Sequence, residues 1–210
     1  MKMKKLLLLK SIRELKNSEV KKIIVTRIKE FKDMRDKPSN EIFKELCFCI
    51  LTANFNAEKS IKIQEKIDDG FLTLPEEKLA EELKKLGHRF PKTRAKYIID
   101  ARKHLPYFKD ILNLEENSLR EWLVKNVKGL GYKEASHFLR NIGYESFAII
   151  DFHILDVLSK HEIIKKPKTL SRKKYLEIEE ILRNIASKLN LTLAELDLYL
   201  WYIETGKILK

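Results

Sequence analysis

Residues 119–151 read LREWLVKNVKGLGYKEASHFLRNIGYESFAIID and form the most informative stretch of the chain. Leu119, Leu123 and Val124 recur at helical spacing and predict one amphipathic helix. A second helix, beginning near Tyr132, is predicted by four more apolar residues at the same spacing, namely Ala135, Phe138, Leu139 and Ile142. The pattern therefore predicts two helices joined by a short turn.

The turn itself has the sequence VKGLG, in which Gly129 and Gly131 flank Leu130. Glycine permits positive φ and lets another backbone approach closely. The free N–H groups and the positive dipole end of the second helix would then face outward, which suits a phosphate. An ordinary helix connection has the same composition, so the turn alone leaves both interpretations open.

The rest of the chain also follows helical periodicity, and no segment sustains the alternation of a strand. Hydroxyl residues followed three positions later by Glu predict helix starts at Thr73, Ser118 and Thr192. A basic helical region is expected over residues 19–36, and residues 147–150 form a short apolar run that could be extended. We therefore expect an all-α protein.

The 210 residues include 43 basic and 31 acidic side chains, which give a net charge of +12, and 44% are hydrophobic. This composition is typical of a folded protein, and the charge indicates a polyanion as partner, either nucleic acid or an anionic membrane surface. No apolar stretch approaches the ~20 residues of a membrane span, and residues 6–9 are too few for a secretory signal. A cytoplasmic location is expected.

Cys47 and Cys49 are the only cysteines, and they lie in an apolar stretch. We expect a buried, reduced pair, because a helix would point the two side chains in different directions. No set of Cys and His residues has the spacing of a zinc or iron–sulfur site.

The motif GLGYKEA, followed by IIDFH, resembles the helix-hairpin-helix superfamily of DNA glycosylases. By this resemblance Lys133 takes the position of the nucleophilic lysine of the bifunctional members, and Asp151 that of the catalytic aspartate. The hairpin covers residues 119–143. Its residues expected to contact DNA are Lys128, Gly129 and Gly131.

The resemblance also implies an all-α fold of two lobes with the active site in the cleft between them. One lobe would comprise residues 1–40 and 155–210, and the central lobe residues 41–154. The family's hairpin holds a structural Na⁺ or K⁺ through backbone carbonyls, which here would be those of Lys125, Val127 and Leu130. His153 would contact a phosphate. No other cofactor is implied, and no iron–sulfur cluster.

Chemistry explains why a lysine and an aspartate suit these positions. Cleavage of an N-glycosidic bond develops oxocarbenium-like charge on the sugar, which a fixed carboxylate stabilises. A neutral lysine amine can attack the sugar carbon and form a Schiff base, from which β-elimination breaks the strand. The structural alternatives are a solvated helix lysine for Lys133 and, for Asp151, the N-cap of a helix over residues 152–159.

Further segments are similar to 8-oxoguanine DNA glycosylases. In LGHR, which is followed by RAKY, the residues His88 and Arg89 would reach the base left unpaired opposite the lesion. In ILTANFN, Asn54 would fill the hole left by the flipped base, with Phe55 as the neighbouring wedge. A helix end for Asn54 and core packing for Phe55 are the alternatives.

The C-terminal sequence DLYLWYIETGKILK, residues 197–210, resembles the tail of the compact archaeal and bacterial 8-oxoguanine DNA glycosylases. In that branch an aromatic residue from the loop and a Trp from the tail sandwich the flipped base, and the terminal Lys helps to recognise it. Phe90, Trp201 and Lys210 occupy these positions. Core packing of the two aromatic residues and a frayed terminus for Lys210 are the alternatives.

The resemblance implies a bifunctional enzyme that flips and excises 8-oxoguanine through a Lys Schiff base and cleaves the abasic strand. We expect a monomer that acts on double-stranded DNA containing 8-oxoguanine, with no membrane partner. One rival is an endonuclease III-like lyase for oxidised pyrimidines, whose usual four C-terminal cysteines are missing here. The others are a non-enzymatic helix-hairpin-helix DNA-binding protein and a membrane-surface protein.

Overall fold

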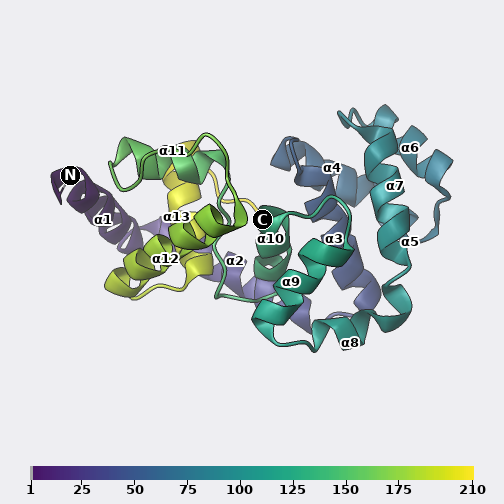
Figure 1. Cartoon of the computed structure of the whole chain (residues 1–210), viewed down its shortest axis with the longest axis horizontal. Helices are drawn as coiled ribbons and strands as arrows, with labels where there is room; N and C mark the ends of the chain where they lie inside the picture. Colours follow the sequence, from purple (N-terminus) through teal and green to yellow (C-terminus); the bar gives the residue numbers. More distant parts are fainter. Residues whose placement is uncertain (1) are drawn as a thin grey trace. The chain divides into compact units, whose positions relative to one another are not determined.

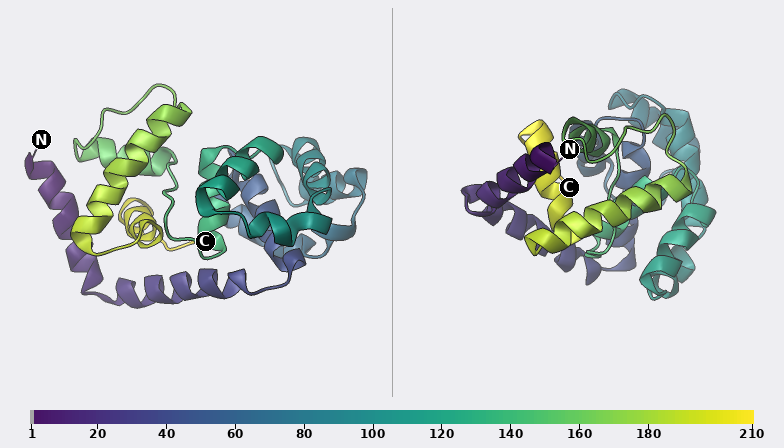
Figure 2. Two further views of the ribbon diagram at one scale, coloured as in Figure 1. Left: turned by 60° about the horizontal axis from the view of Figure 1, so that its bottom comes forward. Right: turned by 60° about the vertical axis from the view of Figure 1, so that its left-hand side comes forward.

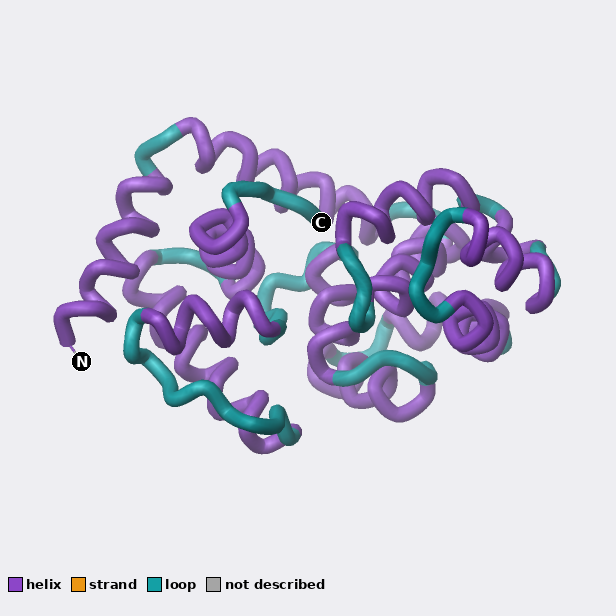
Figure 3. Tube along the Cα trace, turned by 90° about the horizontal axis from the view of Figure 1, so that it is seen from above, coloured by secondary structure: helices purple, strands orange, loops and turns teal. Residues whose placement is uncertain are grey.

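The computed structural model describes residues 2–210 and confirms the expected all-α class. The elements in this part of the chain are thirteen α-helices and one short 3₁₀ helix, and no residue from 2 to 210 lies in a strand (Figures 1 and 3). The contacts divide the chain into two compact units. Unit 1 comprises the residues up to Lys32 together with residues 143–210, and unit 2 comprises residues 33–142.

Unit 1 is built around α13, which contacts the helices α1, α11 and α12 (Figure 2). Its helices are α1 (Lys2–Lys16), most of α2 (Glu19–Arg35), α11 (Phe152–Lys160), α12 (Arg172–Leu189) and α13 (Leu193–Thr205). The α2 helix buries one stripe of residues spaced by three and four, which are Val20, Ile24, Ile28 and Phe31.

Unit 2 is built around α3, whose residues from Ile42 to Thr52 are all buried. A helix that is buried on every side needs partners on every side, and α3 contacts α4, α5, α7, α10 and η1. The elements are α3 (Ser39–Thr52), α4 (Ala57–Ile67), α5 (Gly70–Thr73), α6 (Glu76–Lys85), α7 (Pro91–Arg102), η1 (Leu105–Tyr107), α8 (Phe108–Leu112), α9 (Glu116–Asn126) and α10 (Tyr132–Asn141). Cys47 and Cys49 lie here as buried, reduced thiols, as expected.

The boundaries of the units differ from the predicted ones, which placed residues 33–40 with the chain ends and residues 143–154 in the central lobe. Gly143 explains the second boundary. Its φ is +88°, and a Cβ there would lie only 3.0 Å from the backbone of Lys32. Lys32 also forms a 3.0 Å ion pair with Glu145. The segment that begins at Gly143 therefore packs against α2 before the chain reaches Asp151, so Asp151 belongs to unit 1.

One predicted helix start is confirmed and two are wrong. Thr192 caps α13, because its hydroxyl accepts the Glu195 N–H at 3.1 Å and the Glu195 carboxylate accepts the Thr192 N–H at 2.8 Å. Thr73 instead ends α5, and α6 follows Pro75. Ser118 lies inside α9, which the Glu115 carboxylate caps by accepting two backbone N–H groups.

The apolar run at residues 147–150 belongs to neither a helix nor a strand. Side chains of α12 satisfy its backbone. Glu179 accepts the Ala148 N–H at 3.0 Å, while the Tyr175 hydroxyl accepts the Ile150 N–H at 3.2 Å and donates to the Ala148 carbonyl at 2.6 Å. These bonds fix the backbone that leads to Asp151.

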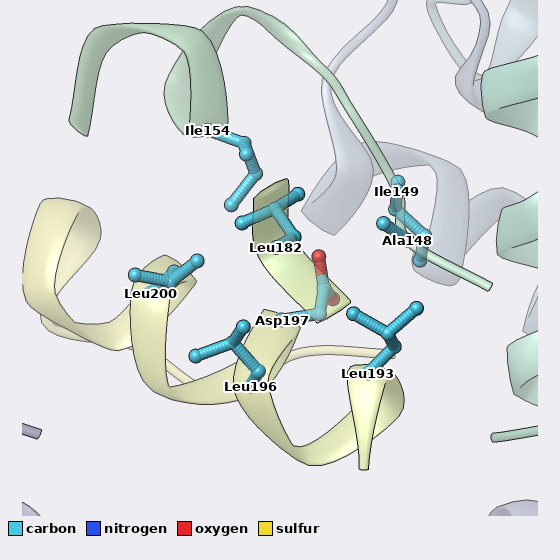
Figure 4. A pocket seen from close by; sticks show the side chains of 8 residues that line it. All are labelled: Ala148, Ile149, Ile154, Leu182, Leu193, Leu196, Asp197 and Leu200. Carbon is cyan, nitrogen blue, oxygen red and sulfur yellow. The ribbon is translucent and has the colours of Figure 1, made fainter. Parts of the chain in front are cut away.

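A small pocket lies beside this segment in the core of unit 1 (Figure 4). Seven apolar residues and the buried Asp197 line it: Ala148, Ile149, Ile154, Leu182, Leu193, Leu196, Asp197 and Leu200. Within residues 2–210, no helix has the length and apolar character needed to cross a membrane.

Candidate active site

The hairpin between α9 and α10 has the predicted form, and α10 begins at Tyr132. Leu130 N–H donates to the Val127 carbonyl at 3.2 Å and closes the turn. Gly129 has φ +87°, and a Cβ there would approach the ring of Tyr97 to 2.5 Å, so this position requires glycine. Gly131 has φ −90°, which other residues also adopt.

Lys133 lies on the first turn of α10 with its side chain 26% exposed. Its Nζ is 3.0 Å from Oε1 of Glu134, whose side chain is 14% exposed. The other oxygen of Glu134 accepts the Gly131 N–H at 3.1 Å. An internal carboxylate therefore accepts the N–H of Gly131, the residue just before the first helical position of α10.

Lys128, the exposed basic residue of the turn, pairs with Asp100 of α7 at 2.8 Å. Lys103 pairs with the other oxygen of the same carboxylate at 2.9 Å. The two ammonium groups lower the pKa of Asp100 to about 2, and Asp100 raises the pKa of Lys128. A DNA phosphate would therefore compete with Asp100 for Lys128.

His88 does not have the exposure that contact with an opposite base requires. It is 4% exposed, its Nδ1 accepts the Phe90 N–H, and its Nε2 lies 3.0 Å from the Leu51 carbonyl. Burial lowers the pKa of His88, which favours the neutral ring with Nε2 as donor. Its ring fixes the loop, whereas the neighbouring Arg89 is exposed.

Asn54 and Phe55 follow the last turn of α3. Asn54 is exposed and has φ +58°, which combines a helix-end conformation with an accessible side chain. The Phe55 ring packs against the His88 ring at a tilt of 41°, with the ring centroids 4.2 Å apart. Arg94 of α7 donates to the Ala53 carbonyl at 2.5 Å and fixes the same loop.

Phe90 is 36% exposed, so it is not a core residue. Cations lie near its ring, with the guanidinium carbon of Arg89 5.0 Å from the centroid and that of Arg94 5.8 Å away. Such contacts stabilise an aromatic ring at the surface. The loop therefore presents an exposed aromatic face held by arginines.

In unit 1, Asp151 caps α11, because its Oδ1 accepts the Ile154 N–H at 2.9 Å. The N-cap interpretation is confirmed. It does not conflict with a catalytic role, since a capping carboxylate is fixed in position and the side chain is only half-buried.

An aromatic cluster follows Asp151. The ring centroid of His153 lies 3.8 Å from that of Phe152 and 4.6 Å from that of Trp201. The rings of His153 and Trp201 meet edge to face. Phe152 is 62% exposed, whereas Trp201 Nε1 is buried without a hydrogen-bond partner in the described chain. Trp201 and Lys210 are both half-buried.

Comparison with known proteins identifies the family. The family model described as 8-oxoguanine DNA glycosylase matches residues 24–191. The chain belongs to this family. It is 61% identical to a protein of Methanocaldococcus jannaschii named 8-oxoguanine DNA glycosylase/AP lyase, over 98% of this chain and all of that one. A protein of Korarchaeum cryptofilum with the same name is 56% identical over 97% of this chain and 98% of its own.

Solved structures agree with this family. The Methanocaldococcus jannaschii 8-oxoguanine glycosylase/lyase in complex with a 15mer DNA containing 8-oxoguanine matches with a TM-score of 0.95 and 59% identity, over 97% of this chain and all of that chain. The 8-oxoguanine DNA glycosylase of Thermotoga maritima matches with a TM-score of 0.92 and 44% identity, over 97% and 98% of the two chains.

Sequence reasoning missed two members of this glycosylase site. Glu134 was not singled out. A Glu at the third position of a helix is nevertheless a known capping signal, because its carboxylate can accept the backbone N–H of the N-cap residue, here Gly131. Arg94 was quoted only within RAKY, and no local pattern shows that it would bond to the end of α3. Among residues 2–210, no three His, Cys, Asp or Glu side chains are grouped so that they could hold a metal ion.

Proposed function

We propose that the protein excises 8-oxoguanine from duplex DNA and cleaves the resulting abasic strand. The observation that carries the proposal is the placement of Lys133 on the first turn of α10, directly after the helix-hairpin-helix turn. Relatives matched over almost their whole length are named for both activities. A DNA-binding module without catalysis does not need a lysine here.

Lys133 acts as the nucleophile in this proposal. Its neutral amine attacks C1′, the N-glycosidic electrons leave with the base, and opening of the sugar gives a Schiff base between Nζ and C1′. Loss of a C2′ proton then expels the 3′ phosphate and breaks the strand. A neutral amine is required because an ammonium has no lone pair.

Asp151 supplies the fixed negative charge. Positive charge develops on the sugar as the glycosidic bond breaks, and a carboxylate already held by the start of α11 needs little reorganisation to stabilise it. His153, two residues later, contacts a DNA phosphate in this proposal.

Base recognition is assigned to exposed or half-exposed groups. Phe90 and Trp201 stack on the flipped base, and Lys210 contacts its edge. Asn54 fills the vacated position, with Phe55 beside it, while Arg89 meets the opposite base. His88 is excluded from this list, because both of its nitrogens are engaged within unit 2.

The hairpin carbonyls fit a monovalent cation, Na⁺ or K⁺, which backbone oxygens bind well. The Val127 carbonyl accepts one hydrogen bond from Leu130 and has a second lone pair. In the described chain no backbone N–H bonds to the carbonyls of Lys125 and Leu130. A bound cation would add positive charge beside Gly129, where a phosphate is expected.

The decisive experiment is borohydride trapping on duplex DNA containing 8-oxoguanine. The native protein should become covalently attached, and Lys133→Gln should abolish both trapping and strand cleavage while DNA binding persists. A variant that is still trapped would move the nucleophile elsewhere. DNA containing thymine glycol serves as the comparison, and faster release from it would favour the endonuclease III-like alternative. We also propose a monomer that acts in the cytoplasm.

A further inference from the structure

The carboxylate of Glu134 joins two parts of the candidate active site. One oxygen accepts the Gly131 N–H at 3.1 Å, and the other lies 3.0 Å from Lys133 Nζ. The first contact fixes the carboxylate on the backbone of the hairpin. Because the second contact uses the same rigid group, the amine is held at a set position beside the turn.

The surroundings restrict how Glu134 can move. Its side chain is 14% exposed. Arg94 of α7 is 7% exposed, and burial lowers the pKa of its guanidinium, an effect that the nearby Tyr97 and Glu134 partly oppose. The carboxylate therefore lies beside the Lys133 ammonium and at the N-terminal end of the α10 dipole, with Arg94 nearby. The bond to the Gly131 N–H keeps the Glu134 side chain turned toward the hairpin.

We propose that Glu134 is the positioning residue and proton acceptor of Lys133, an inference that rests on the proposed lyase chemistry. The ammonium of Lys133 passes one proton to Glu134, leaving a neutral amine and a carboxylic acid. The amine adds to the C1′ aldehyde of an abasic site and gives a carbinolamine. Glu134 then returns its proton to the departing hydroxyl, which leaves as water, and the Schiff base remains.

The physical reason for such a group is the flexibility of lysine. A lysine side chain has about 2 kcal/mol of rotamer entropy to lose, and correct orientation of a nucleophile supplies much of an enzyme's rate. A carboxylate anchored to the Gly131 N–H keeps the amine near one position and provides a base within hydrogen-bonding distance.

Two other roles are possible for the same contacts and make opposite predictions. If Glu134 serves only as a cap, its charge is irrelevant to Schiff-base formation. If it only stabilises the ammonium, removing the charge should free the amine and speed up the reaction. The proposal requires the reaction to slow down.

The test is the single-turnover rate of borohydride trapping on DNA that already contains an abasic site, so that base recognition plays no part. Glu134→Gln is the informative variant, because the amide oxygen still accepts the Gly131 N–H but the amide takes no proton. We expect a rate about 10- to 100-fold lower near neutral pH, with unchanged DNA binding and thermal unfolding.

The pH profile separates proton transfer from structure. In Glu134→Gln the trapping rate should rise with increasing pH and approach the native rate in alkaline solution, where hydroxide removes the proton instead. Glu115→Gln is the matched control, since Glu115 caps α9 by accepting backbone N–H groups at 3.1 Å and none of its contacts involves a lysine. This variant should trap at the native rate.

Equal or faster trapping by Glu134→Gln, or a reduction that is the same at every pH, would overturn the inference. Failure of the native protein to be trapped on any damaged or abasic DNA would instead refute the proposed function. The two failures are therefore distinguishable in one set of measurements.

Discussion

Asp151 combines a structural and a proposed chemical role in one carboxylate. It caps α11 through the Ile154 N–H, and the backbone of residues 147–150 before it is held by Tyr175 and Glu179 of α12. A side chain fixed from both directions is suited to stabilising charge that appears only in a transition state. The two roles can be separated by substitution.

Asp151→Asn should keep the cap and lose the catalysis. Asparagine is as good an N-cap as aspartate, so we expect the free energy of unfolding to change by less than about 0.5 kcal/mol. Excision of 8-oxoguanine should fall by orders of magnitude, because the sugar loses its fixed negative partner. Thermal unfolding and single-turnover excision measure the two effects. Near-native excision by this variant would leave Asp151 only the cap.

Lys210 allows a similar separation between reading the base and cleaving the strand. 8-Oxoguanine and guanine differ at N7, which is a hydrogen-bond donor in 8-oxoguanine and an acceptor in guanine. A well-placed acceptor on the protein therefore discriminates strongly between the two bases. The main-chain oxygen of Lys210 can accept a hydrogen bond from N7–H and its ammonium can donate to the added O8, and the residue is half-buried rather than fully exposed.

Deleting Lys210 should therefore reduce 8-oxoguanine excision strongly and spare cleavage at a preformed abasic site, where no base remains to be read. Parallel assays on the two substrates measure this. If both activities fell equally, the tail would support the fold, and if neither changed, the tail would have no part in recognition.

At the scale of the element, the hairpin depends on one glycine more than on the other. Gly129→Ala would place a Cβ 2.5 Å from the Tyr97 ring at φ +87°, and we expect it to cost about 2 kcal/mol or more of stability. Gly131→Ala is the matched comparison. Its φ is −90° and its nearest contact is 3.3 Å, so its unfolding temperature should fall much less. Equal losses would contradict this account of the turn.

The sequence was sufficient for elements whose signals are local. The start of α10 at Tyr132 and the Thr192 cap of α13 follow from glycine, hydroxyl and apolar positions within a few residues. The errors arise where several residues compete for one role. Glu115 takes the N-cap position of α9, three residues before Ser118, and Pro75 takes that of α6, two residues after Thr73.

Tertiary burial decides features of the site that the sequence does not show. His88 has the right residue type for a base contact, but its position under Phe55 and against the Leu51 carbonyl depends on packing between distant segments. The same applies to the contact between Arg94 and Ala53. Periodicity shows which face of a helix is buried and does not show which partner covers it.

At the scale of the whole molecule, charge is unevenly distributed. Residues 1–32 and 143–210 contain 22 Lys and Arg against 13 Asp and Glu, a net charge of +9, whereas residues 33–142 contain 21 against 18, a net charge of +3. Binding of undamaged duplex should therefore weaken steeply with salt, because counterions are released from every phosphate engaged. A flat dependence in an anisotropy titration would contradict nucleic-acid binding.

The ion pair between Lys128 and Asp100 affects how strongly DNA binding depends on salt. The pKa of Asp100 in the folded protein is about 2, below the value for an unfolded chain. Such a carboxyl group stabilises the folded state at pH values above its unfolded pKa, and this stabilisation is lost as the pH falls through the folded pKa. The pair with Lys128 is thus intact at every pH used for DNA binding. A phosphate that takes Lys128 must replace an existing partner.

Asp100→Asn should release Lys128 for DNA. We expect tighter binding of undamaged duplex at low salt and a logarithmic salt slope that is steeper by about 0.9, the value for one additional phosphate contact. Glu81→Gln is the matched control, because this substitution changes the net charge by the same amount. Glu81 lies on α6 of the same unit and pairs with Lys78. If both variants tightened binding equally, net charge would explain the effect. If Asp100→Asn alone did so, and equally for damaged and undamaged DNA, Lys128 would be a backbone contact that reads no base.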